Sequence, residues 1–287
     1  VLIDSDVANE IDDQFALAYA FSRQNDFDIL GVTVAPFQVE WQKNTDIRDG
    51  LIDSKNETYR IMRLFGMKHD SENPFVYLGC DNFLSAGYND TNPAVEKIIQ
   101  LAKEHSSFYV CCLGTLTNVA MALRIKPSIA SKIKIVWLGT DNVFLDKFED
   151  LNYKKDVVAF NEVISSKADF TIFPTYIART FVTSTYEFGK NIKSNNVTKY
   201  LNSLFGKFKF TEENMGIKTI YDIGPVAYLL NKKEFVTKKL AANIFVKDKK
   251  VKIAEDRQVT YVVKAPQNNG VWIDFMKSIN NAENFYL

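Results

Sequence analysis

The first twenty residues constrain the fold of this chain more than any other stretch does. A short, branched apolar run, Val1–Ile3, directly precedes four aspartates, Asp4, Asp6, Asp12 and Asp13. Such a run is typical of a strand buried on both faces of a parallel sheet, and after Asp12 apolar side chains recur at helical spacing. We therefore predict an α/β fold with an open, mostly parallel, Rossmann-like sheet and helices on both faces. The aspartates then lie at the carboxyl end of the first strand, where such sheets bind ligands.

Four carboxylates so close together need a compensating charge. Ionised neighbours repel one another, and burying them together costs several kcal/mol unless a cation or protons compensate. Hard divalent cations prefer oxygen ligands, and Ca²⁺ accepts irregular, partly bidentate ligand sets more readily than Mg²⁺. In the alternative, the acids only cap a helix and complement its dipole, which accounts for Asp12 and Asp13 but not for Asp4 and Asp6. The pattern therefore favours a calcium site.

The same stretch resembles the signature of the inosine–uridine nucleoside hydrolase family, in which a D-x-D strand end is followed by a D-D pair that opens a helix. The family usually has Pro-Gly in a short turn between the acidic pairs, whereas this chain has a longer turn, Val7–Ile11. The resemblance implies Ca²⁺-dependent hydrolysis of the N-glycosidic bond of a ribonucleoside or related riboside, giving free base and ribose. It also implies a homodimer or a homotetramer, and a role in nucleoside salvage.

The resemblance assigns a role to each of the four aspartates. Asp6 would ligate the metal and act as the general base for the attacking water. Asp13 would be a second metal ligand, and Asp12 would accept hydrogen bonds from ribose hydroxyls. Asp4 would orient the loop from behind the site.

Two later stretches match further parts of the family pattern. The segment TLTNVAMAL follows a predicted strand, Phe108–Leu113, and the resemblance implies that the main-chain carbonyl of Leu113 points at the metal. A plain strand–turn–helix is equally compatible with that segment alone. In Asp150-Leu151-Asn152, Asn152 would bind a ribose hydroxyl and Asp150 would replace a glutamate with the same function. The alternative for these two residues is a polar helix N-cap region.

The dipeptide Tyr221-Asp222 precedes an apolar helix and stands where the family has His-Asp. Asp222 therefore matches a metal ligand, although an acid at this position is also a common N-cap. The family's histidine assists departure of the base, whereas a phenol, with an ordinary pKa near 10, is a poor proton shuttle at neutral pH. Tyr221 is instead expected to bind substrate by hydrogen bonding or stacking. Phe37, Trp41 and Trp272 are further candidates for stacking, with core packing as the alternative.

The remaining sequence alternates between strand-like and helical patterns without a repeat or a linker, so we predict one domain over residues 1–287. Residues 175–218 are expected to form a lid or a helical insertion. A polar loop is expected at Gln38–Asp53, before a helix at Asn56–Phe65. Beyond Leu240 we expect three short antiparallel strands. These are Leu240–Val246, Val251–Ile253 and Val259–Val263.

The composition excludes several classes of protein. Lysine plus arginine and aspartate plus glutamate both number 35, so no net charge draws the chain to nucleic acid or to a membrane surface. No apolar stretch approaches the ~20 residues of a membrane helix, and no signal peptide is expected. Cys80, Cys111 and Cys112 are typical of reduced core residues, which predicts a cytoplasmic protein. With only His69 and His105, a histidine-rich metal centre is excluded.

Two alternatives to a nucleoside hydrolase remain at this point. A haloacid-dehalogenase-type Mg²⁺ phosphatase also begins with D-x-D after its first strand, and Asp141 and Asp146 resemble its later metal ligands. That alternative lacks a persuasive lysine and leaves the Asp12-Asp13 pair unused. The second alternative is a non-catalytic nucleoside- or ribose-binding protein on the same fold, which the replacement of histidine by Tyr221 motivates.

Overall fold

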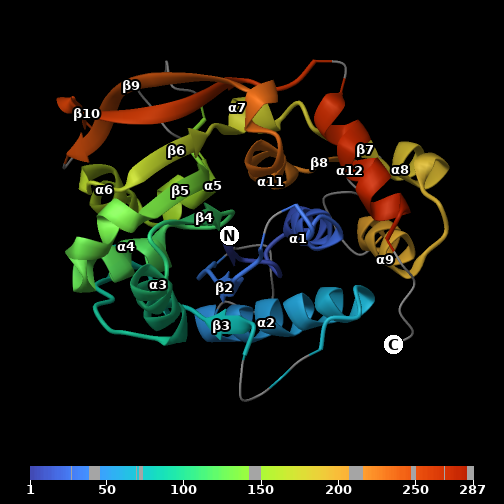
Figure 1. The fold of residues 1–287 in the computed structure, drawn as a ribbon, viewed down its shortest axis with the longest axis horizontal. Coiled ribbons are helices and arrows are strands. Elements are labelled where there is room, and N and C mark those ends of the chain that lie inside the picture. The colour runs from blue at the N-terminus through green and yellow to red at the C-terminus, as the bar shows by residue number, and fades with distance from the viewer. Residues whose placement is uncertain are drawn as a thin grey trace.

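The computed structural model describes residues 1–26, 28–38, 46–68, 70, 74–141, 150–206, 216–246, 250–267 and 269–282 of the 287-residue chain. In these ranges, eight strands form one sheet: β1 (Leu2–Ser5), β2 (Gly31–Val34), β3 (Val76–Leu78), β4 (Phe108–Cys112), β5 (Ile133–Leu138), β6 (Asp169–Phe173), β9 (Val236–Val246) and β10 (Lys250–Lys264). The order across the sheet is β3-β2-β1-β4-β5-β6-β10-β9, and every neighbouring pair is parallel except β9 and β10 (Figure 1). The predicted open, mostly parallel α/β sheet is therefore confirmed.

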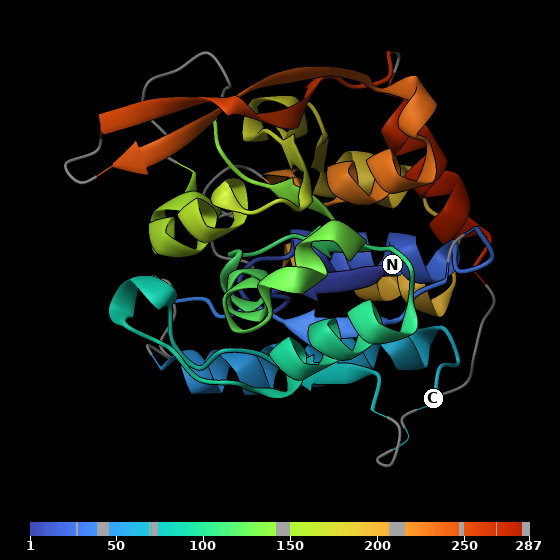
Figure 2. The same ribbon diagram turned by 60° about the vertical axis from the view of Figure 1, so that its left-hand side comes forward.

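Helices cover both faces of this sheet (Figures 1 and 2). One layer contains α1 (Asp12–Ser22), α2 (Ile47–Leu64), α9 (Asn196–Phe205), α11 (Ile223–Leu230) and α12 (Gly270–Asn280), and the other contains α3 (Pro93–Glu104), α4 (Thr117–Ile125) and α6 (Val157–Ser165). Side chains along the central strands alternate between the two layers, because successive residues of a strand point to opposite faces. Cys111 and Val136 belong to one core, whereas Val110 and Ile135 belong to the other. Both faces are thus apolar and buried, as expected for a parallel sheet.

Shorter elements connect these layers. They are the helices α5 (Leu151–Lys155), α7 (Thr175–Ala178) and α8 (Thr185–Asn191), the 3₁₀ helices η1 (Leu84–Ala86), η2 (Pro127–Lys132) and η3 (Lys232–Glu234), and the strands β7 (Val182–Ser184) and β8 (Ile217–Thr219). Strands β7 and β8 pair with each other as a separate antiparallel sheet. No helix in the described ranges is long and apolar enough to cross a membrane.

The structure corrects the loop predicted at Gln38–Asp53. Helix α2 begins at Ile47 and runs for 18 residues, so the end of the predicted loop is helical, and residues 39–45 lie outside the described ranges. The side chain of Asp46 caps this helix by accepting a hydrogen bond from the Arg48 N–H at 2.9 Å. Apolar residues at three- and four-residue spacing are then buried on one side. The polar residues on the exposed side concealed this helix in the sequence.

The predicted C-terminal strands also need correction. Two long strands replace the three short ones, because β10 passes through both Val251–Ile253 and Val259–Val263. It pairs with β9 along most of its length, and a register irregularity between Ala254 and Gln258 accommodates the polar residues that suggested a break. The hairpin lies at one edge of the main sheet (Figure 2), where Thr260 pairs in parallel with Thr171 of β6.

The segment 175–218, predicted to be a lid or a helical insertion, contains α7, β7, α8 and α9 and ends within β8, with residues 207–215 outside the described ranges. Its helices α8 and α9 pack against α1 and α12. Phe188 and Phe205 contact the Phe15 ring, with ring centroids 5.3 and 5.7 Å apart, and Phe15 in turn contacts Phe275. An aromatic cluster therefore joins this segment to the first helix, whose opening turn carries two of the predicted site residues.

Candidate active site

A pocket lies where the strand order of the sheet reverses. From β1 the chain proceeds to β2 and β3 on one side, whereas β4 joins the other side of β1, so the connections diverge and leave a crevice at the carboxyl ends of these strands. The pocket has a volume of about 260 Å³ and is lined by residues that follow β1, β4 and β5 and by the first turns of α1, α5 and α11. All eight residues predicted for the site line it: Asp6, Asp12, Asp13, Leu113, Asp150, Asn152, Tyr221 and Asp222.

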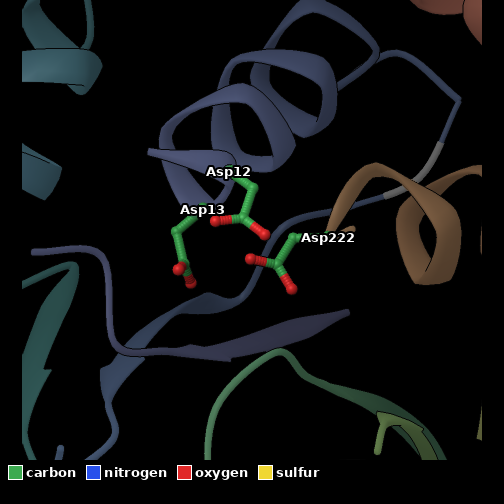
Figure 3. A group of neighbouring side chains, drawn as sticks. All are labelled: Asp12, Asp13 and Asp222. Atoms are coloured by element: carbon green, nitrogen blue, oxygen red, sulfur yellow. The ribbon is translucent and has the colours of Figure 1, made fainter. Parts of the chain in front are cut away.

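Three of these carboxylates form a compact group. Asp12 and Asp13 come from the first turn of α1, Asp222 directly precedes α11, and Figure 3 shows their carboxylates gathered between the two helices. One oxygen of each lies within 4.8 Å of the others, and all three side chains are buried. Within the described ranges, Asp222 Oδ1 is buried without a hydrogen-bond partner. Buried, mutually repelling carboxylates with a spare acceptor are the donor set that a hard divalent cation such as Ca²⁺ requires, so the residues fit that ion.

Asp6 and Leu113 lie in the same pocket but outside that group of three. Asp6 follows β1, and its Oδ2 accepts a hydrogen bond from Asn9 Nδ2 at 2.8 Å. The carbonyl oxygen of Leu113 accepts a hydrogen bond from Asn152 Nδ2 at 2.6 Å, and its second lone pair leaves it able to serve as a ligand. The longer turn between Asp6 and Asp12 thus still returns the chain to the same crevice.

Asp4 does not line the pocket but supports it from behind. Its Oδ1 accepts hydrogen bonds from Thr33 Oγ1 at 2.6 Å and from Asn118 Nδ2 at 2.8 Å. The Oδ1 of the same Asn118 amide accepts the Cys80 N–H at 2.9 Å. A fully buried carboxylate thereby joins β1 and β2 to the start of α4 and to the turn after β3. This explains why the first turn of α4 contains an asparagine.

Asp150 and Asn152 hold the side of the pocket formed by β4 and β5. Asp150 is the N-cap of α5 and accepts the Tyr153 N–H at 3.0 Å. Asn152 Nδ2 donates both to Leu113 O and, at 3.1 Å, to Leu138 O. Its amide therefore bridges the ends of two adjacent strands and leaves its Oδ1 as the acceptor. Asp150 therefore caps α5, as the alternative from the sequence predicted, and also lines the pocket.

Burial dominates the electrostatics of the site. Removal from water raises the pKa of Asp6 to about 7 and that of Asp13 to about 8, and the charge of Asp6 adds to the rise at Asp13. The pKa of Asp222 is raised well above its ordinary value by burial and then by the charge of Asp13. Burial also raises the pKa of Asp12 to about 7, although the Lys218 ammonium opposes that rise. Without a cation, the site therefore favours protonated carboxyls; a divalent ion would favour their ionised forms.

The structure adds residues that the sequence did not single out. Lys218 on β8 is almost buried, its Nζ bonds to Glu10 Oε2, and it lies 3.8 Å from Asp12 Oδ1. The same ammonium lies 5.6 Å from the centroid of the Tyr221 ring. Arg179 also lines the pocket, with its Nη2 3.8 Å from Asp141 Oδ1. Glu10 belongs to the acidic opening stretch and was detectable there, but Lys218 has no local signal that distinguishes it from a surface lysine.

Of the four aromatic residues considered for stacking, Tyr221 lines the pocket. Trp272 instead packs against Phe275, with ring centroids 5.2 Å apart, and Phe37 is buried. Trp41 lies outside the described ranges. Core packing, the alternative considered from the sequence, thus accounts for Trp272 and Phe37.

Comparisons with known proteins identify a family for the sequence and similar solved structures for the fold. The sequence matches the family described as inosine-uridine preferring nucleoside hydrolase over residues 1–283. The fold is similar to that of a plant nucleoside hydrolase, with a TM-score of 0.76 and 16% identity over 98% of both chains. It is also similar to the inosine-uridine preferring nucleoside hydrolase from Bacillus anthracis (TM-score 0.71, 14% identity, 97% of this chain and 98% of that chain) and to the purine-preferring ribonucleoside hydrolase from Gardnerella vaginalis (TM-score 0.71, 16% identity, 98% of both chains). No curated protein sequence matches the chain significantly.

Proposed function

Since the chain belongs to the inosine-uridine preferring nucleoside hydrolase family, we propose that it hydrolyses the N-glycosidic bond of a ribonucleoside or related riboside, with Ca²⁺ as cofactor. The products are the free base and ribose. The observation that carries the proposal is the convergence of buried Asp12, Asp13 and Asp222, from distant parts of the chain, in a pocket that Asp6 also lines. Such a set is costly to bury unless a cation compensates it.

The proposed metal ligands are Asp6, Asp13, Asp222 and the main-chain carbonyl of Leu113. When bound, Ca²⁺ would neutralise these carboxylates and make a nearby water more acidic. Asp12 belongs to the same group, but the Lys218 ammonium already offsets part of its charge. We therefore assign Asp12 to the ribose hydroxyls.

The remaining residues act on water and sugar. Asp6 lines the pocket at the end of β1 and, as a carboxylate, accepts the proton of the attacking water. Asn152, whose Nδ2 is committed to two main-chain carbonyls, offers its Oδ1 to a ribose hydroxyl. Asp150, one position before α5, accepts another hydroxyl. Holding the sugar at three points fixes C1′ relative to the water, which lowers the entropic part of the barrier.

The test is a panel of nucleosides, assayed for release of reducing sugar with Ca²⁺ and with a chelator. We expect ribose release that depends on Ca²⁺, and no release of phosphate from p-nitrophenyl phosphate. The phosphatase alternative belongs to a different family, and its second late acid, Asp146, lies outside the described ranges. Absence of sugar release from every riboside would reject the proposed hydrolase.

Tyr221 favours a second candidate function, a non-catalytic protein that binds nucleosides or ribose in the same pocket. Calorimetry that showed ribose or nucleoside binding, together with no base released over long incubation, would support that function. We also propose a homodimer or homotetramer, to be measured by light scattering. The three free, buried cysteines are in keeping with the proposed cytoplasmic location.

A further inference from the structure

The pocket is strongly acidic. Among the described residues that line it, seven are carboxylates, and Arg179 is the cationic one. If all seven are ionised, a divalent cation, Arg179 and Lys218 together leave three negative charges uncompensated. Such a pocket repels anions and attracts a cationic ligand.

Among its described lining residues, the pocket has no histidine to act as the acid for the leaving group. A neutral nucleobase departs easily only if a proton reaches it as the C1′–N bond breaks. In the described structure no histidine lines the pocket, and His105 lies at the end of α3. Asp141 and Asp150, on the other side of the pocket, accept main-chain N–H groups at 3.0 Å and cap the start of α5.

Tyr221 offers a surface for positive charge. The Lys218 ammonium already lies 5.6 Å from its ring centroid, and the residue lines the pocket beside Asp222. An aromatic ring attracts a cation placed over its face, and more strongly when water is excluded. The ring is therefore suited to bind a flat, positively charged heterocycle.

We propose that the substrate is a riboside whose ring nitrogen carries a positive charge, of the N-ribosylpyridinium class. The inference rests on the proposed hydrolase function and names its substrate. Water oxygen forms a bond to C1′ and gives one proton to Asp6. The C1′–N bond breaks, and its electron pair stays on the ring nitrogen, which becomes neutral. No proton has to be delivered to the aglycone, so the reaction does not need a histidine among the described residues that line the pocket.

The first test compares nicotinamide riboside, which is a pyridinium cation, with inosine and uridine in the Ca²⁺-loaded wild type and in Tyr221→His. Wild type should hydrolyse the cation with the higher kcat/KM. Histidine supplies an acid, so in the variant kcat for inosine and uridine should rise about 10²-fold relative to kcat for the cation. Equal or faster wild-type hydrolysis of the neutral nucleosides, or no gain in the variant, would overturn the inference.

A second pair of variants separates the ring from its hydroxyl. Tyr221→Leu should raise the KM for nicotinamide riboside about tenfold relative to Tyr221→Phe, because only the phenylalanine keeps the attraction between ring and cation. Loss of turnover in Tyr221→Phe would show that the hydroxyl is needed as an acid and would contradict the inference. Tyr186→Leu is the matched control: Lys190 Nζ lies 5.9 Å from its ring centroid, and Tyr186 is exposed outside the pocket.

A binding measurement does not depend on turnover. Calorimetry measures the affinity of the protein, loaded with Ca²⁺ and ribose, for 1-methylnicotinamide and for nicotinamide. The two ligands have nearly the same shape, but only 1-methylnicotinamide is a cation. The cation should bind about tenfold more tightly at low salt, with the difference narrowing as ionic strength rises. Equal affinities would overturn the inference. If no riboside is hydrolysed, the hydrolase proposal fails, and this comparison alone decides the preference for charge.

Discussion

Asp6 and Asp12 lie at the two ends of one acidic turn, but the structure surrounds them differently. Asp6 accepts a hydrogen bond from the neutral amide of Asn9, whereas Asp12 lies beside the Lys218 ammonium. Binding of a divalent cation therefore relieves more repulsion at Asp6 and Asp13 than at Asp12. At the scale of single residues, the distribution of counter-charges separates the proposed metal ligands from the proposed sugar acceptor.

Asp6→Asn tests the proposed base. The amide has nearly the same shape but cannot take a proton from water, so kcat should fall by about 10³-fold, which corresponds to about 4 kcal/mol of barrier lowering. Thermal unfolding should show that the protein stays folded, because a buried, repelling charge has been removed. A variant with near-wild-type turnover would eliminate this role for Asp6.

Lys218→Met tests the counter-ion of Asp12. We expect KM for ribosides to rise about tenfold with a smaller change in kcat, because Asp12 and Tyr221 lose the ammonium that holds them. Affinity for Ca²⁺, measured by calorimetry, should increase, since a neighbouring cation no longer repels the ion. Lys218→Arg should restore both values, and Lys190→Met, on the exposed face of α8, is the control. Unchanged KM and Ca²⁺ affinity would show that Lys218 has no such role.

The elements behind the pocket depend on a close approach of two backbones. A Cβ at Gly79 would lie 2.0 Å from the Val34 carbonyl oxygen and 2.5 Å from the Asn118 amide. The same Asn118 amide holds Asp4 and thereby the end of β1. The turn after β3 is therefore tied to the strand that positions the acidic turn.

Gly79→Ala should lower the free energy of unfolding by about 2–3 kcal/mol, because the methyl group forces β2 and the start of α4 apart. Urea denaturation measures this change. The control is Gly206→Ala, where an added Cβ meets no atom within 4 Å, and where we expect less than about 0.5 kcal/mol. Equal stability of the two variants would refute the close approach.

At the scale of the whole molecule, the buried carboxylates couple stability to pH and to calcium. Their pKa values are raised in the folded protein, to about 7 for Asp6 and about 8 for Asp13, against about 4 in an unfolded chain. Between these values the folded state holds protons that the unfolded state has released. Stability from these groups is thus complete at low pH and is lost as pH rises through the folded pKa values.

In the presence of a chelator, we therefore expect the midpoint of thermal unfolding to fall as pH rises from 5 to 8. Added Ca²⁺ should reverse the loss, and it should stabilise the protein more at pH 8 than at pH 5, because it binds ionised carboxylates. Thermal melts at each pH, with chelator and with Ca²⁺, measure both effects. If the protein in the presence of chelator became more stable as pH rises toward 8, the proposed site would be contradicted.

Local patterns were sufficient for the class of fold and for the acids of the site. Apolar periodicity predicted the parallel strands and most helices, because burial on a face repeats at a fixed spacing. The helix at Ile47–Leu64 was missed in part, since its exposed residues are polar, and the long β10 was divided at the polar residues around Ala254 and Gln258. In both elements, packing against neighbours overrode the local preference.

The sequence by itself determined the kind of sheet and the end of the sheet at which the acids cluster. It also showed that Tyr221 stands where the family has a histidine. Only the tertiary structure decided which charges meet. Lys218 and Glu10 are 208 positions apart in the chain yet form an ion pair beside Asp12. Asp222 reaches Asp12 and Asp13 from another helix. Spacing along a chain encodes the faces of helices and strands, whereas contacts between distant elements arise only when those faces pack together.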